Sequence, residues 1–181
     1  MSPGVDRTRT LRGAVSGAVA AAVWGLQQPL DKLVFSSRYD DIELLGKAVT
    51  RGDGWFPIGL GLHIGSGAVF GAVYANVAPA IPAQPMLRGP VAALTEHVVL
   101  WPLVAVTDRL HPARSDLPKL QGNRAAFVQA AWRHLVFGLV LGELERRVNA
   151  EPETEPPEPE TNFSSNGHGS LEHAVSVHDS P

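Results

Sequence analysis

The sequence contains no cysteine, and it contains no lysine or arginine after Ala150. The absence of cysteine excludes disulfides, thiol redox motifs, cysteine-ligated zinc, iron–sulfur clusters and covalently attached c-type haem. Because neither a basic run nor an alternation of basic and aromatic residues occurs, nucleic acid is not expected as a partner. A P-loop, an H-E-x-x-H motif and a G-x-S-x-G motif are also missing, so we predict no catalytic residues and no enzymatic activity.

The charges divide the chain into two parts. Seven of the 18 acidic residues follow Ala150, whereas all 15 Lys and Arg precede it, so a body of net charge +4 carries a tail of −7. Residues 150–181 consist mostly of Glu, Pro, Thr, Ser, Asn, Gly and His, and they offer too little apolar surface to offset the entropy lost on ordering. We therefore expect residues 1–149 to form the folded domain and residues 150–181 to form a disordered acidic tail.

Four apolar stretches of the body approach the roughly 20 residues that a helix needs to cross a membrane. They cover residues 11–30, 55–81, 90–106 and 124–145, and only the second stands out by hydropathy alone because it contains no charged residue. The third contains Glu96 and His97, and the fourth contains Arg133 and His134. Taken together, they predict an all-α integral membrane bundle of four transmembrane helices, with the lipid bilayer as its partner.

A soluble helical bundle is the main alternative fold. Five glycines within residues 55–81 argue against it, because Gly in a helix costs about 1 kcal/mol relative to Ala in water. Membrane helices use such small residues for close packing. A cleaved secretory signal is a second alternative, since three arginines precede the apolar run 13–26, but the Ala18-Val19-Ala20 cleavage pattern falls inside that run.

A short amphipathic helix is expected between the first two spans, within residues 36–51. Ile42, Leu45 and Val49 recur there at helical spacing. Asp40 followed three residues later by Glu43 forms a capping box, which predicts where the helix starts. We expect this helix to lie at the membrane surface.

Small residues recur every four positions along the predicted spans, and residues at that spacing form one ridge on a helix. Such ridges allow two helices to approach closely, and they are also compatible with a homo-oligomer. The residues predicted to pack helix against helix are Gly13, Gly17, Gly25, Gly59, Gly67, Gly71, Gly138 and Gly142.

Five polar residues fall near the middle of the spans when depth is counted at 1.5 Å per residue: His63, Glu96, His97, Arg133 and His134. Ionisable groups at that depth are costly and indicate a functional site. We expect Glu96 and Arg133 to form an ion pair. Three interpretations remain open: hydrogen bonds that only hold helices together, a proton-linked pathway, and a haem or metal site formed by His63, His97 and His134. No cofactor is predicted outright.

The order of these features resembles the YagU-type family of small bacterial inner-membrane proteins. The resemblance covers about residues 60–148 and is carried by His63 with Gly67–Tyr74, by Gly89–Pro102 with His97 midway, and by Arg133–Phe137 leading to Glu143–Arg147. The resemblance implies a helical, multi-pass protein of the inner (plasma) membrane. The activity of that family is unassigned, and the family is linked to tolerance of acid. The long acidic tail sets this chain apart from that family.

Overall fold

The computed structural model describes residues 6–150, which contain helices and connecting loops and no β-strand. The helices are α1 (Arg7–Val34), α2 (Asp41–Val49), α3 (Trp55–Val77), α4 (Pro85–Leu100), α5 (Val104–Leu110) and α6 (Arg124–Val148), with 3-10 turns at Ala78–Ala80 and Trp101–Leu103. The predicted all-α class is confirmed. The predicted disordered tail, apart from Ala150, lies outside the described residues.

Three of the described segments are long and apolar enough to cross a membrane. They are Trp55–Ala80, Pro85–Leu110 and Arg124–Val148. Helix α1 is not among them although it has 28 residues, because its glycines and Gln27, Gln28 and Pro29 lower the mean hydropathy of its uncharged part, residues 13–30. The structure therefore has three candidate spans where the sequence predicted four.

The span that the sequence predicted at residues 90–106 is longer in the structure, beginning at Pro85 and ending at Leu110. Pro85 is the first residue of α4, a position where its missing N–H costs nothing. Pro102 interrupts the regular hydrogen bonding, and the chain passes through a 3-10 turn before α5 continues. Three prolines, Pro85, Pro90 and Pro102, are thus accommodated inside one long helical segment.

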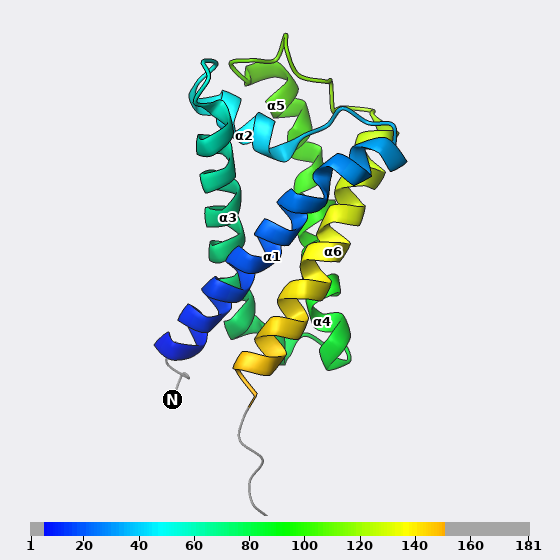
Figure 1. Cartoon of the computed structure of the whole chain (residues 1–181). Helices are drawn as coiled ribbons and strands as arrows, with labels where there is room; N and C mark the ends of the chain where they lie inside the picture. The colour runs from blue at the N-terminus through cyan, green and yellow to red at the C-terminus, as the bar shows by residue number, and fades with distance from the viewer. Residues whose placement is uncertain (1–5, 151–181) are drawn as a thin grey trace, which may run out of the picture. The chain divides into compact units, whose positions relative to one another are not determined.

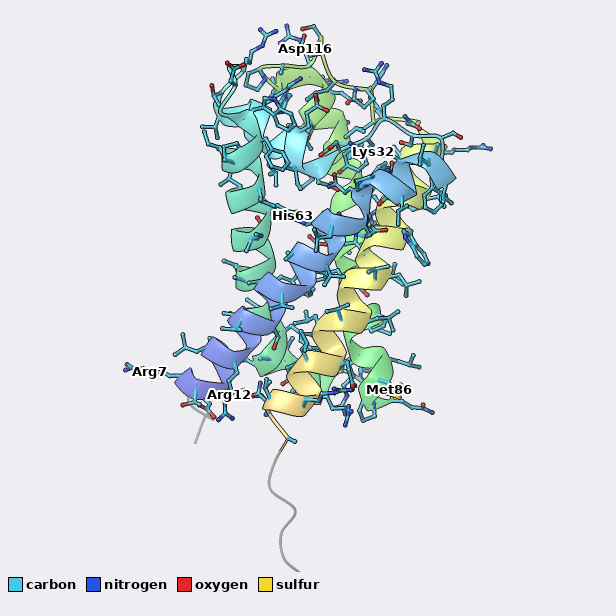
Figure 2. The ribbon with its side chains drawn as sticks, in the orientation of Figure 1. Arg7, Arg12, Lys32, His63, Met86 and Asp116 are labelled. Carbon is cyan, nitrogen blue, oxygen red and sulfur yellow. The ribbon has the colours of Figure 1, made fainter. Side chains whose placement is uncertain are left out.

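The long helices run antiparallel to their neighbours, in the spatial order α3, α1, α6, α4 (Figure 1). Helix α1 crosses between α3 and α6, and α4 packs on α6. The N-terminus of α1 and the C-terminus of α6 lie at one end, whereas α2 and α5 lie at the other (Figure 1). Figure 2 shows Arg7, Arg12 and Met86 at the first end and Lys32 and Asp116 at the second. We call these the terminal end and the loop end.

Helix α2 begins where the sequence predicted. The Asp40 side chain accepts a hydrogen bond from the Glu43 N–H at 2.8 Å, which satisfies one of the donors at the helix start. Glu43 itself pairs with Lys47 along the helix at 2.6 Å. The apolar face of α2, centred on Ile42 and Gly46, is buried against the first turns of α3. This contact holds α2 across the loop end.

Glycines allow close helix crossings at three places. Where α1 meets α3, a Cβ on Gly17 would lie 2.0 Å from the Gly67 carbonyl oxygen, and a Cβ on Gly71 would lie 2.2 Å from that of Gly13. Where α4 meets α6, Gly89 lies against the backbone of two predicted packing glycines, Gly138 and Gly142. Gly59 is similarly close to the backbone of α2, whereas Gly25 only approaches the Ile42 side chain, at 3.4 Å.

Gly17→Ala is expected to destabilise the protein by about 1–3 kcal/mol, because the added methyl group meets backbone that cannot move aside without separating α1 from α3. Gly61→Ala is the matched control, since nothing lies within 4 Å of its Cβ position and alanine is the better helix former. Thermal unfolding in detergent, followed by circular dichroism, measures both. Equal unfolding temperatures for the two variants would contradict this crossing.

Candidate functional site

Arg133 of α6 is fully buried in a cage of acceptors at the loop-end half of the bundle. Its guanidinium makes two hydrogen bonds to Asp31 of α1, at 2.6 and 2.7 Å, and one to Asp41 of α2, at 2.6 Å. It also donates to the Tyr39 carbonyl oxygen at 3.1 Å. The exposed fractions of the Arg133 and Asp31 side chains are 0% and 1%. One cation therefore ties together the ends of α1 and α2 and the middle of α6.

Two further side chains complete this cage. Gln129, one turn before Arg133, donates to Asp31 at 2.7 Å. The Tyr39 hydroxyl donates to Asp41, and the Arg133 guanidinium lies 5.4 Å from the centre of the Tyr39 ring. Two carboxylates around one arginine leave a net negative charge, and the donors from Gln129 and Tyr39 offset part of the cost of burying it.

Tyr39 and Asp41, two residues of the cage at the start of α2, have shifted pKa values. Burial raises the pKa of Tyr39 well above its usual value, and the neighbouring Asp41 raises it further through its charge and its hydrogen bond. Burial alone would raise the pKa of Asp41 as well, but the charge of Arg133 and the hydrogen bond from Tyr39 prevail and hold it below 3.8. Tyr39 therefore stays protonated and Asp41 stays ionised at neutral pH.

The lowered pKa of Asp41 makes stability depend on pH in the acid range. Its contribution is present in full above the pKa of the unfolded chain and is lost as the pH falls through the lower pKa of the folded state. We expect Asp41→Asn to destabilise the protein strongly at neutral pH and progressively less as the pH falls below about 4. Unfolding midpoints of the unchanged protein and of Asp41→Asn, measured between neutral pH and acid pH, test this expectation. A difference between the two midpoints that does not change with pH would contradict it.

His134, the residue after Arg133, faces α4 and pairs with Glu96. Its Nδ1 lies 2.7 Å from the Ala130 carbonyl oxygen, and its Nε2 lies 2.9 Å from Glu96 Oε2. A carbonyl oxygen only accepts, so Nδ1 carries a hydrogen. One further proton must then lie between Nε2 and Oε2, giving either an imidazolium with a carboxylate or an imidazole with a carboxylic acid. The pair holds one shared proton.

His63 of α3 lies on the other side of Trp24. Its Nε2 donates to the Ala21 carbonyl oxygen of α1 at 3.1 Å, and its side chain is buried. The Trp24 ring makes edge contacts with both His63 and His134, at 5.1 and 4.8 Å between ring centres. A single indole of α1 thus separates the histidine of α3 from the Glu96–His134 pair.

His97 lies behind the pair, stacked among rings. Its ring centre is 4.8 Å from that of His134, 4.7 Å from Phe127 and 5.2 Å from Trp101. Among the described residues, neither the buried His97 Nε2 nor the buried Trp24 Nε1 has a hydrogen-bond partner. Both atoms lie beside His134, so the group formed by His63, His97, His134 and Trp24 contains polar atoms that are free to form further hydrogen bonds.

A pocket of about 120 Å³ opens beside the pair. It is lined by polar groups of Glu96, His134, His63 and Ser66 and by aromatic rings of Trp24, Phe70 and Phe137. A second pocket of about 330 Å³ lies next to it between α3 and α4, shares Phe70 and Glu96 with it, and is otherwise lined by apolar side chains and Thr95 and Tyr74. Glu96, whose side chain is 36% exposed, stands where the two meet.

The structure brings together four of the five predicted polar residues and separates the fifth. His63, Glu96 and His134 line one pocket beside Trp24 and His97 stacks on His134, whereas Arg133 points to a different side of α6. The predicted ion pair between Glu96 and Arg133 is therefore wrong. Adjacent residues of a helix differ in direction by about 100°, and it is His134 that faces α4.

Sequence reasoning missed the partners of Arg133. Asp31, Asp41 and Tyr39 lie outside the expected spans, and the only signal was an acid placed directly after the apolar run of the first helix. It also missed Trp24 and Gly89. Within residues 6–150 no group of three or more His, Asp or Glu side chains is arranged to hold a metal ion. Both ring nitrogens of His134 are already engaged, which does not favour ligation through this residue.

Comparison with known proteins finds no matching protein family, no matching curated protein and no matching solved structure. The functional proposal below therefore rests on the geometry of the Arg133 cage and of the residues around the Glu96–His134 pair.

Proposed function

We propose that the chain is an integral protein of the bacterial inner membrane and that α1 is its fourth span. Helix α1 is as long as the three candidate spans and packs antiparallel against α3 through glycine contacts. Its inward polar groups at the loop end, Gln28 and Asp31, are buried, and several of its outward side chains are apolar and exposed, among them Leu11, Val15, Val19 and Leu26. That distribution suits a helix that contacts lipid on one side and protein on the other.

We propose further that the Glu96–His134 pair is a proton-binding site with a proton-linked role in the membrane. The observation that carries this proposal is the position of the His134 imidazole, with Nδ1 2.7 Å from the Ala130 carbonyl oxygen and Nε2 2.9 Å from Glu96 Oε2. An imidazole and a carboxylate are both groups that can bind and release a proton. His134 lies about 15 Å along α6 from its start, halfway through a hydrocarbon core of about 30 Å.

Two titratable groups of neighbouring helices lie near this pair, His63 of α3 and His97 of α4. Arg133 forms its cage with Asp31 of α1 and Asp41 of α2 on another side of α6. Because the two carboxylates outweigh the positive charge of Arg133, the cage does not oppose protonation of the pair as an isolated cation would. The pocket of about 120 Å³ has room for several water molecules at about 30 Å³ each, which gives the shared proton a route of exchange.

Proton flux into vesicles tests this function. Purified protein is reconstituted into liposomes that contain a pH-sensitive dye, with valinomycin and potassium to hold the membrane potential at zero. We expect the lumen to acidify faster after an external acid step than in protein-free vesicles. Equal rates in the two preparations would contradict the proposal. A role in tolerance of acid, which the YagU-type resemblance implies, rests on the same site.

A purely structural role is the second candidate, and the Arg133 cage favours it. The cage joins three helices through buried charge-assisted hydrogen bonds and involves no exposed group of Arg133 or Asp31. His63 likewise uses its N–H to bind the backbone of a neighbouring helix. Under this alternative, substitutions of the histidines would lower stability and leave proton flux at the protein-free rate throughout.

A further inference from the structure

A groove between α3 and α4 leads from the outside of the bundle to the Glu96–His134 pair. Helix α3 packs on α1 and α2, and α4 packs on α6, but α3 and α4 are not packed against each other. The apolar pocket of about 330 Å³ lies between them, lined by Val73 and Val77 of α3 and by Ala92 and Val99 of α4. Its size falls within the range of about 300–1,000 Å³ found for small-molecule sites.

Glu96 is the charged group at the inner end of this groove. It lines both the apolar pocket and the smaller pocket next to it, and its side chain is 36% exposed, so a molecule in the groove can reach the carboxylate. No Lys or Arg lines either pocket. An anion would therefore meet a carboxylate without a compensating permanent cation, whereas a cation would meet its complement.

Aromatic rings surround the carboxylate. Trp24, Phe70 and Phe137 line the inner pocket together with His63, with ring centres 6.0 Å apart for Trp24 and Phe137 and 5.4 Å apart for Phe70 and Phe137. Cations are attracted to the faces of such rings, and the attraction grows when the cation is removed from water. A carboxylate among aromatic rings at the end of an apolar groove selects for a cation that carries apolar groups.

Resting on the proton-binding function proposed above, we propose that this site binds a hydrophobic monovalent cation in exchange for its proton. With the proton in place, the Glu96–His134 pair has no net charge. When the cation enters, the shared proton leaves to water, His134 remains a neutral imidazole with its Nδ1–H on Ala130, and the Glu96 carboxylate balances the charge of the cation. One proton is released for each cation bound, and no bond other than those to the proton changes.

The test uses tetraphenylphosphonium as the cation and tetraphenylborate, which has the same shape and the opposite charge, as its control. Purified full-length protein in a neutral detergent is titrated with each ion in weakly buffered solution, and binding and proton release are measured by calorimetry in two buffers of different protonation enthalpy. We expect saturable binding of the cation with release of about one proton, and no saturable binding of the anion.

Glu96→Gln should weaken cation binding at least about tenfold and abolish proton release, because the neutral amide keeps the shape of the side chain without its charge. Glu143→Gln is the matched control, since its carboxylate is 34% exposed, close to the value for Glu96, but lies outside the groove on the last turns of α6. This variant should bind as the unchanged protein does.

The outcomes separate this proposal from the proton-binding function. Cation binding that is unaffected by Glu96→Gln, or that releases no proton, would overturn the exchange. Absence of cation binding in a protein that still moves protons across vesicles would overturn the exchange and leave the proton-binding function standing. Proton release on cation binding, without proton flux into vesicles, would support the exchange and contradict a pathway that conducts protons in the absence of the cation.

Discussion

Arg133→Gln is expected to destabilise the protein by about 3–5 kcal/mol, the cost of removing one partner from a buried ion pair. The guanidinium is wholly buried and supplies three hydrogen bonds to Asp31 and Asp41. Glutamine cannot reach both carboxylates and carries no charge, so two buried acids are left facing each other without a cation. Their desolvation and mutual repulsion then oppose the packing of α1 and α2 on α6.

The experiment compares unfolding midpoints in a graded series of denaturing and neutral detergent, followed by helical circular dichroism. Arg147→Gln is the control: it removes an arginine of the same helix whose ion pair with Glu143 is 68% exposed on the arginine side, where such pairs contribute about 0–1 kcal/mol. Adding Asp31→Asn to Arg133→Gln should recover part of the loss by removing one uncompensated charge. If Arg133→Gln and Arg147→Gln unfold together, the buried cage does not hold the helices as described.

The glycine contacts show what the sequence could predict. Because residues four apart share a helix face, the spacing of Gly13 with Gly17 and of Gly67 with Gly71 placed each pair on one ridge, and the structure packs the two ridges together. Gly89 was not anticipated, since it precedes Pro90 and lay outside the expected span. The start of α2 was predictable for a related reason, as the cap at Asp40 depends on residues within one turn.

The partners of the buried charges could not be predicted in the same way. Arg133 and His134 are adjacent, and nothing in their spacing shows which of the two faces α4 and which faces α1. The choice depends on how far α1 crosses over α6 and on where the loop after α1 places Tyr39 and Asp41. Both are properties of the assembled bundle. Depth along each helix was accessible from the sequence, and the pairing between helices was not.

Glu96→Gln is expected to reduce proton flux into vesicles to the rate of protein-free vesicles. The amide cannot take up or release a proton, so proton exchange between His134 Nε2 and Glu96 Oε2 stops. The side chain keeps its shape and stays within hydrogen-bonding distance of His134. Because Glu96 is partly exposed and makes one interaction outside its own helix, the substitution should leave the unfolding midpoint nearly unchanged. Loss of flux with unchanged stability distinguishes a proton site from a contact that only holds helices together.

Glu143→Gln controls for removal of a carboxylate from a helix of this bundle and should leave flux unaltered. His134→Asn supplies the converse test, since it removes the group that shares the proton while Glu96 remains. If Glu96 conducted protons alone, through water in the adjoining pocket, His134→Asn would retain flux and only Glu96→Gln would lose it. Loss of proton flux in both variants would mean that flux requires the intact Glu96–His134 pair, because each partner would then hold the proton only in the presence of the other. Retention in both would remove the proton site from this cluster and leave the hydrogen bonds of His63 and His134 as helix contacts alone.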